Sequence, residues 1–161
     1  MPVHLITFHT YRAWRVDDPR GYYQRGRPGV QAPAAGLAWH RDANAKQPAV
    51  TLNTAQQNRV IAAIQDACER RGWTIYGISA TPNHVHSLVG WRDGASVHDV
   101  ADTLKRLAGL ALTRAAGSSG HRWFGRGHDQ KRVVDRKHFD YLREGYLPKH
   151  RKENGTVWIG P

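Results

Sequence analysis

The chain has 161 residues, the usual size of one domain, and 40% of them are hydrophobic, including six Trp, six Tyr and three Phe. This composition excludes a disordered chain, and the 16 glycines show no collagen-like period. Lys and Arg number 24 against 13 Asp and Glu, so the formal net charge is +11. Such a charge favours a polyanionic partner, with a solvated basic surface as the alternative.

The chain contains one cysteine, Cys68, which has no partner for a disulfide within the chain. We therefore expect a reducing compartment such as the cytoplasm. The N-terminus MPVHLITFHTYRAW lacks a cationic start followed by a long apolar run, and no stretch is apolar enough to span a bilayer. We expect neither a signal peptide nor a membrane partner.

The first predicted element is a strand over Val3 to Trp14, where β-branched and aromatic residues dominate. From about residue 17 to 50, prolines and glycines interrupt any helical or strand period. This pattern predicts a long surface loop inserted into a single domain, residues 1–161. Connections of such length are often functional, so we interpret the loop as a substrate-contacting insertion.

The clearest helix lies within Thr51 to Arg71, with Asn53 or Thr54 as its N-cap and Gly72 as its stop. Its apolar residues recur with the 3.6-residue period of one buried face. We expect Cys68 to be a small buried hydrophobe on that face. The apolar positions are Val60, Ile61, Ile64, Ala67 and Cys68.

The remaining pattern predicts two strands, a helix, a strand and a short last helix. With the first two elements, this is a βαββαβ order followed by a helix. We therefore predict an α+β, ferredoxin-like fold, an antiparallel sheet with helices on one face plus a C-terminal helix. The predicted elements are Trp73 to Ser79, His84 to Trp91, Val97 to about Ala115, Lys131 to Val134 and Arg136 to Gly145.

The tripeptide His84-Val85-His86 is the most informative motif for chemistry. Alternate side chains of a strand share a face, so both histidines point one way while Val85 and Val89 point toward the helices. Two adjacent imidazoles form half of a site for a divalent metal. A surface pair without a metal is the alternative.

The segment TPNHVHSLV resembles the metal-binding strand of the single-tyrosine HUH transposases, which include the insertion-sequence 200 type and the REP-associated tyrosine transposases. Further matches span nearly the whole chain: LITFHTYRAW, DDPRGY, RRGW, RWFGRG and FDYLREG. The resemblance implies a ferredoxin-like nuclease and strand transferase that cuts single-stranded DNA with a tyrosine and Mg2+ or Mn2+. The intermediate would be a covalent 5′-phosphotyrosine, and the protein would act at the nucleoid of a bacterial-type cell.

That family places its tyrosine on the last helix, with a polar metal ligand about one turn later. The resemblance therefore implies Tyr141 as the nucleophile, with Tyr146 as its competitor. Position 145, four residues after Tyr141, is a glycine instead of Asn or Gln. The third-ligand role therefore falls on Glu144, with Asn83 or a further histidine as substitutes.

Residues 121–161 hold ten Lys and Arg against five acids, interleaved with aromatic residues. This mixture suits phosphate contacts and base stacking, so the expected partner is single-stranded or hairpin DNA. Two alternatives stay open: a hairpin-binding protein that no longer cleaves DNA, and a replication-initiator nuclease. The sequence does not separate a monomer from a homodimer. The expected DNA contacts are Arg122, Arg126, Lys131, Arg132, Arg136, Lys137 and Arg143.

Overall fold

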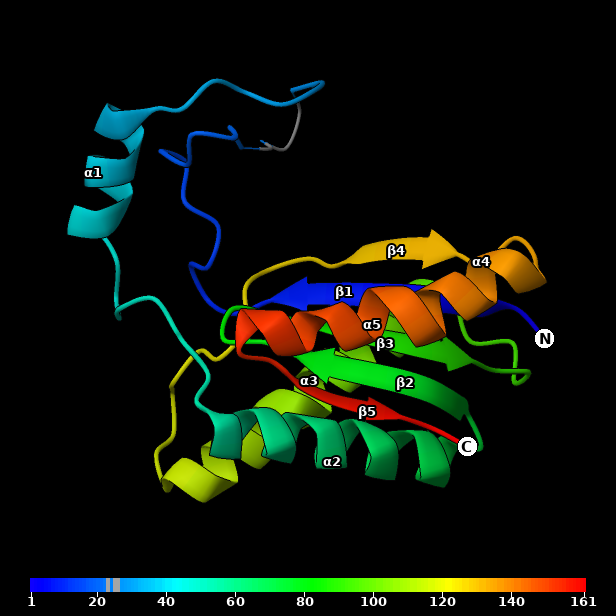
Figure 1. The fold of residues 1–161 in the computed structure, drawn as a ribbon. Helices are drawn as coiled ribbons and strands as arrows, with labels where there is room; N and C mark the ends of the chain where they lie inside the picture. Colours follow the sequence, from blue (N-terminus) through cyan, green and yellow to red (C-terminus); the bar gives the residue numbers. More distant parts are fainter. Residues whose placement is uncertain (23, 25–26) are drawn as a thin grey trace.

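The computed structural model describes residues 1–22, 24 and 27–161. Its centre is an antiparallel five-stranded sheet with the order β4-β1-β3-β2-β5 (Figure 1). The first four strands have the ferredoxin-like order, so the predicted α+β fold is confirmed. The strands are β1 (Val3–His9), β2 (Thr74–Ala80), β3 (His84–Gly90), β4 (Asp129–Arg132) and β5 (Thr156–Ile159).

Two long helices, α2 (Thr54–Arg71) and α3 (Val97–Ala116), cover one face of the sheet. Ile6 and Phe8 of β1 and Val85 and Val89 of β3 point into the apolar cluster beneath these helices. Alternation along the strands therefore works as predicted. From the helices, this cluster receives Val60, Ile61, Ile64, Ala67, Cys68, Val100, Ala101, Leu104, Ala108 and Leu112.

Helix α2 starts and stops by local chemistry. The Asn53 side chain accepts a hydrogen bond from the Gln56 backbone N–H, and the Gln56 side chain accepts one from the Asn53 N–H, each at 2.9 Å. This reciprocal capping places the helix start at Thr54. Gly72 ends the helix with a left-handed φ of 65°. Within the described residues, no helix is both long and apolar enough to cross a membrane.

A C-terminal helical segment crosses the opposite face of the sheet (Figure 1). Leu142 and Leu147 of this segment pack on Leu5 and Leu88. Gly77 permits the close approach, because a Cβ there would lie 2.7 Å from Leu147 Cδ1. The segment consists of α4 (Arg136–Asp140), a π-helical turn η1 (Tyr141–Tyr146), α5 (Leu147–Lys149) and a 3-10 turn η2 (His150–Glu153).

The structure corrects several predicted boundaries. The first strand ends at His9, well before Trp14, and Arg12 adopts a left-handed φ of 59°. The predicted loop at 17–50 contains a helix, α1 (Ala35–Ala43), which packs Ala38 against Val16 and Tyr22. Residues 23, 25 and 26 of that loop lie outside the described residues.

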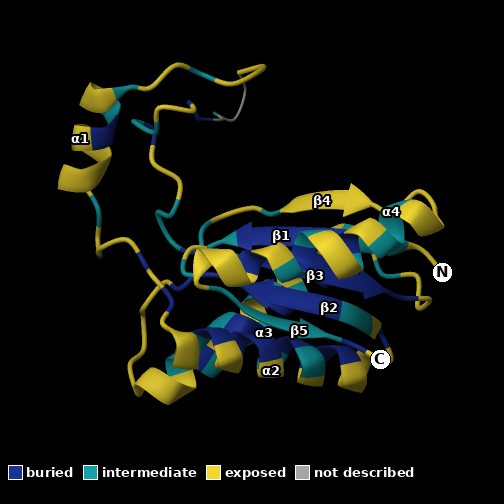
Figure 2. Cartoon of the chain, in the orientation of Figure 1, coloured by how far each residue is buried: buried dark blue, intermediate teal, exposed yellow. Residues whose placement is uncertain are grey.

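The C-terminal half also departs from the prediction. Strand β4 ends at Arg132, two residues before the predicted end, the last helix runs past Gly145, and β5 was not predicted. Figure 2 shows the contrast in burial: the central strands are buried, whereas α1 and β4 are largely exposed. Short exposed elements bury too few apolar residues to leave a clear periodic pattern.

Candidate active site

Three histidines meet on the face of the sheet that the C-terminal segment crosses. His84 and His86 project from β3 on the side away from α2 and α3, as the alternation predicted, and η2 brings His150 beside them. One ring nitrogen from each lies within 4.8 Å of the other two. The ring centroids are 4.7 Å apart for His84 and His86, and 4.6 Å for His86 and His150.

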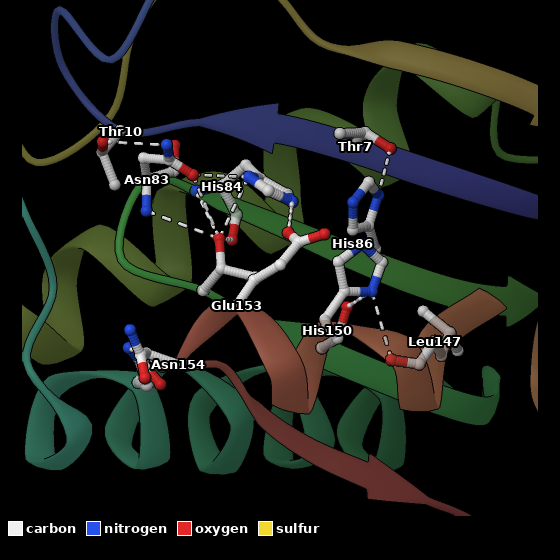
Figure 3. A network of polar contacts seen from close by, with 12 residues as sticks. Thr7, Thr10, Asn83, His84, His86, Leu147, His150, Glu153 and Asn154 are labelled. Carbon is white, nitrogen blue, oxygen red and sulfur yellow. Dashed lines mark hydrogen bonds and ion pairs between the residues drawn. The ribbon is translucent and has the colours of Figure 1, made fainter.

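Each of these imidazoles is oriented through its Nδ1 atom. His86 Nδ1 lies 2.7 Å from Thr7 Oγ1, and His150 Nδ1 lies 3.1 Å from the Leu147 carbonyl oxygen (Figure 3). His84 Nδ1 lies 2.6 Å from Asn83 Oδ1. An Nδ1–H that donates to such an oxygen leaves the Nε2 lone pair free, which is the usual arrangement around a metal-binding histidine.

Burial keeps the three imidazoles neutral. It lowers the pKa of His84 to about 4 and that of His86 to about 2, and positive charge on neighbouring histidines acts in the same direction. Burial also lowers the pKa of His150. Metal binding requires the unprotonated nitrogen, so the cluster is ready to bind a metal at neutral pH.

The donor set fits a divalent transition metal. Three neutral imidazoles suit Mn, Fe, Co, Ni or Zn better than Mg2+, which prefers oxygen ligands. Glu153 offers one such oxygen, because its Oε2 lies 4.0 Å from His84 Nε2 (Figure 3). The described residues therefore provide nitrogen ligands and an adjacent carboxylate.

The two candidate tyrosines occupy different environments. Tyr146 is half-buried, with its ring centroid 5.3 Å from that of His86 and 5.0 Å from that of His150. Tyr141 is 60% exposed, and its ring centroid is 6.4 Å from that of Tyr146. Burial, together with the nearby Glu153 carboxylate, raises the pKa of Tyr146.

A cleft of about 540 Å³ opens onto this cluster and includes His84, His86 and Tyr146 in its wall. Trp14 and Arg20 form part of the same wall, with the Arg20 guanidinium 5.3 Å from the Trp14 ring. Trp14 also lines two further hollows, of about 600 and 290 Å³, toward the 17–50 insertion. The three hollows therefore adjoin one another at Trp14.

The predicted third ligand lies elsewhere. The Glu144 side chain is 67% exposed, and its Oε1 lies 3.8 Å from Arg143 Nη1, so the structure does not bring it to His84 and His86. Asn83 contacts the Nδ1 atom of His84 and so orients the imidazole ring. His150 was not among the predicted metal ligands, although its spacing of four residues from Tyr146 places both on one helical face.

The predicted DNA contacts divide into four groups. Arg122 and Arg126 line the 290 Å³ pocket, which they share with Arg41 of α1. Arg143 donates a hydrogen bond to the Gly160 carbonyl oxygen at 2.6 Å and so anchors the C-terminus. Arg136 pairs with Asp140 at 2.9 Å. The exposed remainder consists of Lys131, Arg132 and Lys137.

Comparison with known proteins agrees with the predicted family. A family model described as "Transposase IS200 like" matches residues 38–128, which include His84 and His86 but neither tyrosine. No curated protein matches the chain. Among solved structures, a Deinococcus radiodurans R1 protein described as a transposase has 13% identity and a TM-score of 0.52, over 95% of this chain and 90% of its own.

A second solved structure is a REP-associated tyrosine transposase bound to a REP hairpin. It has 13% identity and a TM-score of 0.49, over 91% of this chain and 70% of its own. At such identities, structural likeness concerns the fold alone. The family model, in contrast, covers more than half of the sequence. This chain therefore belongs to the IS200-like transposase family.

Proposed function

We propose that this chain cuts and rejoins single-stranded DNA, with Tyr146 as the nucleophile and a divalent metal held by His84, His86 and His150. The observation that carries the proposal is the position of Tyr146 beside three neutral imidazoles, at the wall of one open cleft. The family membership supports DNA cleavage as the reaction class.

The chemistry is an in-line displacement at phosphorus. The Tyr146 oxygen forms a bond to phosphorus while the bond to the 3′ oxygen breaks. The phenol proton passes to water, and the departing 3′ oxygen takes up a proton, so the products are a 5′-phosphotyrosine and a 3′-hydroxyl. A bound divalent ion would neutralise the phosphoryl charge and stabilise the departing oxygen.

The geometry favours Tyr146 over Tyr141, the residue that the family resemblance implied. Tyr146 is followed four residues later by His150, so the pair has the spacing of a tyrosine and a polar ligand one turn apart. Tyr141 has Gly145 at that position, and Tyr141 is exposed outside the cleft. The two tyrosines are the first and last residues of a π-helical turn, a feature often found at functional sites.

A hairpin-binding protein without cleavage is the alternative that the glycine four residues after Tyr141 would favour, because a metal ligand is then missing at that position. His150 supplies a polar residue at the equivalent position after Tyr146, which supports cleavage. We retain the non-cleaving alternative as an outcome of the test below.

We propose that the single strand passes along the three hollows that meet at Trp14. This indole is 44% exposed and lies between the histidines and the arginine-lined pocket. Exposed aromatic rings stack on unpaired bases, and arginines contact phosphates. The DNA should therefore be single-stranded at the cleft, and affinity should fall as salt rises.

The test is the trapping of a protein–DNA adduct. Wild type is incubated with Mn2+ and a hairpin-bearing single strand labelled at its 3′ end, because the tyrosine stays attached to the downstream fragment. We expect a labelled band that survives denaturation, no band for Tyr146→Phe, and a band of near wild-type intensity for Tyr141→Phe. Peptide mapping of the adduct identifies the tyrosine independently.

A band for Tyr146→Phe and none for Tyr141→Phe would identify Tyr141 as the nucleophile. An adduct in both variants would show that neither tyrosine of the last helical segment is the nucleophile. No adduct in wild type with several divalent metals, combined with tight hairpin binding, would support the non-cleaving alternative.

A further inference from the structure

A second group of metal-ligating side chains lies at the start of α3, separate from the candidate active site. His98 and Asp102 are four residues apart on α3, so they share a helix face, and His128 approaches them from the segment just before β4. Three ligand atoms, one from each residue, lie within 4.8 Å of one another.

The contacts within this group leave one nitrogen without a hydrogen bond. His98 Nε2 lies 3.3 Å from Asp102 Oδ2, and His128 Nδ1 lies 3.9 Å from Asp102 Oδ1. The His128 side chain is only 8% exposed, and its Nδ1 atom is shielded from water with no hydrogen-bond partner among the described residues. An unpaired buried polar atom is costly, so this nitrogen needs a partner.

We propose that His98, Asp102 and His128 bind a second divalent transition metal of the Zn2+ or Ni2+ class, with water completing the shell. Two imidazoles and one carboxylate are a common ligand set for such ions. Tetrahedral zinc holds its ligand atoms roughly 3.3 Å apart, so the present group must contract by up to about 1.5 Å. His98 and Asp102, with side chains 71% and 51% exposed, have the freedom to move toward the buried His128.

Lys105 is the charged neighbour that such a metal must displace. Its Nζ lies 3.5 Å from Asp102 Oδ1 and also donates a hydrogen bond to the Gly127 carbonyl oxygen at 3.0 Å. Lys105 can therefore release Asp102 and keep its backbone partner. Its positive charge still opposes a cation, so Lys105→Gln should tighten metal binding a few-fold.

The bound ion would join α3 to the segment that leads into β4. That strand has four residues, all exposed, at the edge of the sheet. A metal that binds only the folded chain raises stability by mass action, so the ion would hold this edge in place.

The experiment is a Zn2+ titration by calorimetry on the untagged full-length chain. The His84→Ala/His86→Ala variant removes the active-site cluster, so binding that remains reports the second site alone. We expect one Zn2+ per chain in this variant, and a loss of affinity of at least about tenfold after a further His128→Ala or His98→Ala change. His40→Ala is the matched control, because His40 is an exposed histidine on α1.

His98 is largely exposed, so its replacement tests the site even where His128→Ala weakens the fold. The proposal is overturned when the His84→Ala/His86→Ala variant binds no Zn2+, or when its affinity is unchanged by both further substitutions. DNA cleavage by the single variants His98→Ala and His128→Ala should persist, so the outcome is independent of the proposed nuclease function.

Discussion

Alternate residues of β1 and β3 build the two faces of the sheet from different chemistry. Ile6, Phe8, Val85 and Val89 contact α2 and α3 in the larger apolar cluster. On the opposite face, Thr7 contacts His86, and the C-terminal segment adds a small apolar cluster and His150. A shift of one position along either strand would exchange the two sets of side chains.

The two faces of the sheet make different contributions, one to stability and the other to chemistry. Apolar packing under α2 and α3 is non-directional, so many hydrophobic side chains of suitable volume would serve there. The histidine face depends on directional contacts between residues far apart in sequence, such as the 79 positions between Thr7 and His86. Changes on the first face should alter mainly folding, and changes near the histidines mainly activity.

The largest expected effect is the loss of a proposed metal ligand. His86→Ala and His150→Ala should each lower cleavage by a factor of at least about 10³, because fewer imidazoles would remain to hold the ion proposed to stabilise the transition state. Glu144→Ala should change cleavage less than twofold, since this exposed side chain lies away from the cluster. The measurement is the single-turnover rate of strand cleavage in Mn2+. Equal losses for Glu144→Ala and His150→Ala would contradict the ligand assignment.

The second prediction concerns the apolar face. Leu104 is fully buried beneath the sheet, so Leu104→Ala should lower the free energy of unfolding by about 2–5 kcal/mol. Urea unfolding measures the loss, with Leu110→Ala as the control, because Leu110 lies on the same helix and is 40% exposed. The cleavage rate of the folded fraction should stay near wild type. A large fall in that rate would show that the apolar face also controls activity, which contradicts the proposed division between the two faces.

The third prediction tests the support behind a histidine. Thr7→Val keeps the shape of the side chain but removes the hydroxyl that lies 2.7 Å from His86 Nδ1. Metal affinity should fall by about 10–100-fold, as for other hydrogen-bond partners of metal-binding histidines. Thr7→Ser retains the hydroxyl and should bind metal nearly as wild type does. Calorimetry in the His98→Ala background measures metal binding at the active-site histidines alone. Equal metal affinities for Thr7→Val and Thr7→Ser would show that the Thr7 hydroxyl does not support the His86 ring.

The smallest expected effect is a pH dependence from the apolar face. Burial raises the pKa of Cys68 from 9.0 to about 12. Between these values the folded state retains a proton that the unfolded state releases, so the contribution of Cys68 to stability falls as pH rises from 9 toward 12. The free energy of unfolding, measured with urea from pH 8 to 10.5, should decline more steeply for wild type than for Cys68→Ala. Parallel declines for the two proteins would mean that burial does not raise the pKa of the thiol.

Local sequence determined much of the fold. The apolar period from Val60 to Cys68, the Asn53 cap and the Gly72 stop act within a few residues of one another, and α2 forms where they predict. The pairing of His84 with His86 likewise follows from strand alternation alone. By contrast, α1 and β5 have few buried residues and no long period, so their sequences carry little signal.

Only the tertiary structure decided which residues join His84 and His86. The sequence by itself determined the histidine strand, the helices beneath it and a basic, aromatic C-terminal region. It did not determine the path of the last helical segment, because that path depends on Leu142 and Leu147 packing on Leu88 and on the space left at Gly77. That packing brings His150 and Tyr146 to the cluster and leaves Glu144 and Tyr141 exposed. Contacts between residues more than 50 positions apart have no local periodic signature, so the fold had to bring them together before they could be recognised.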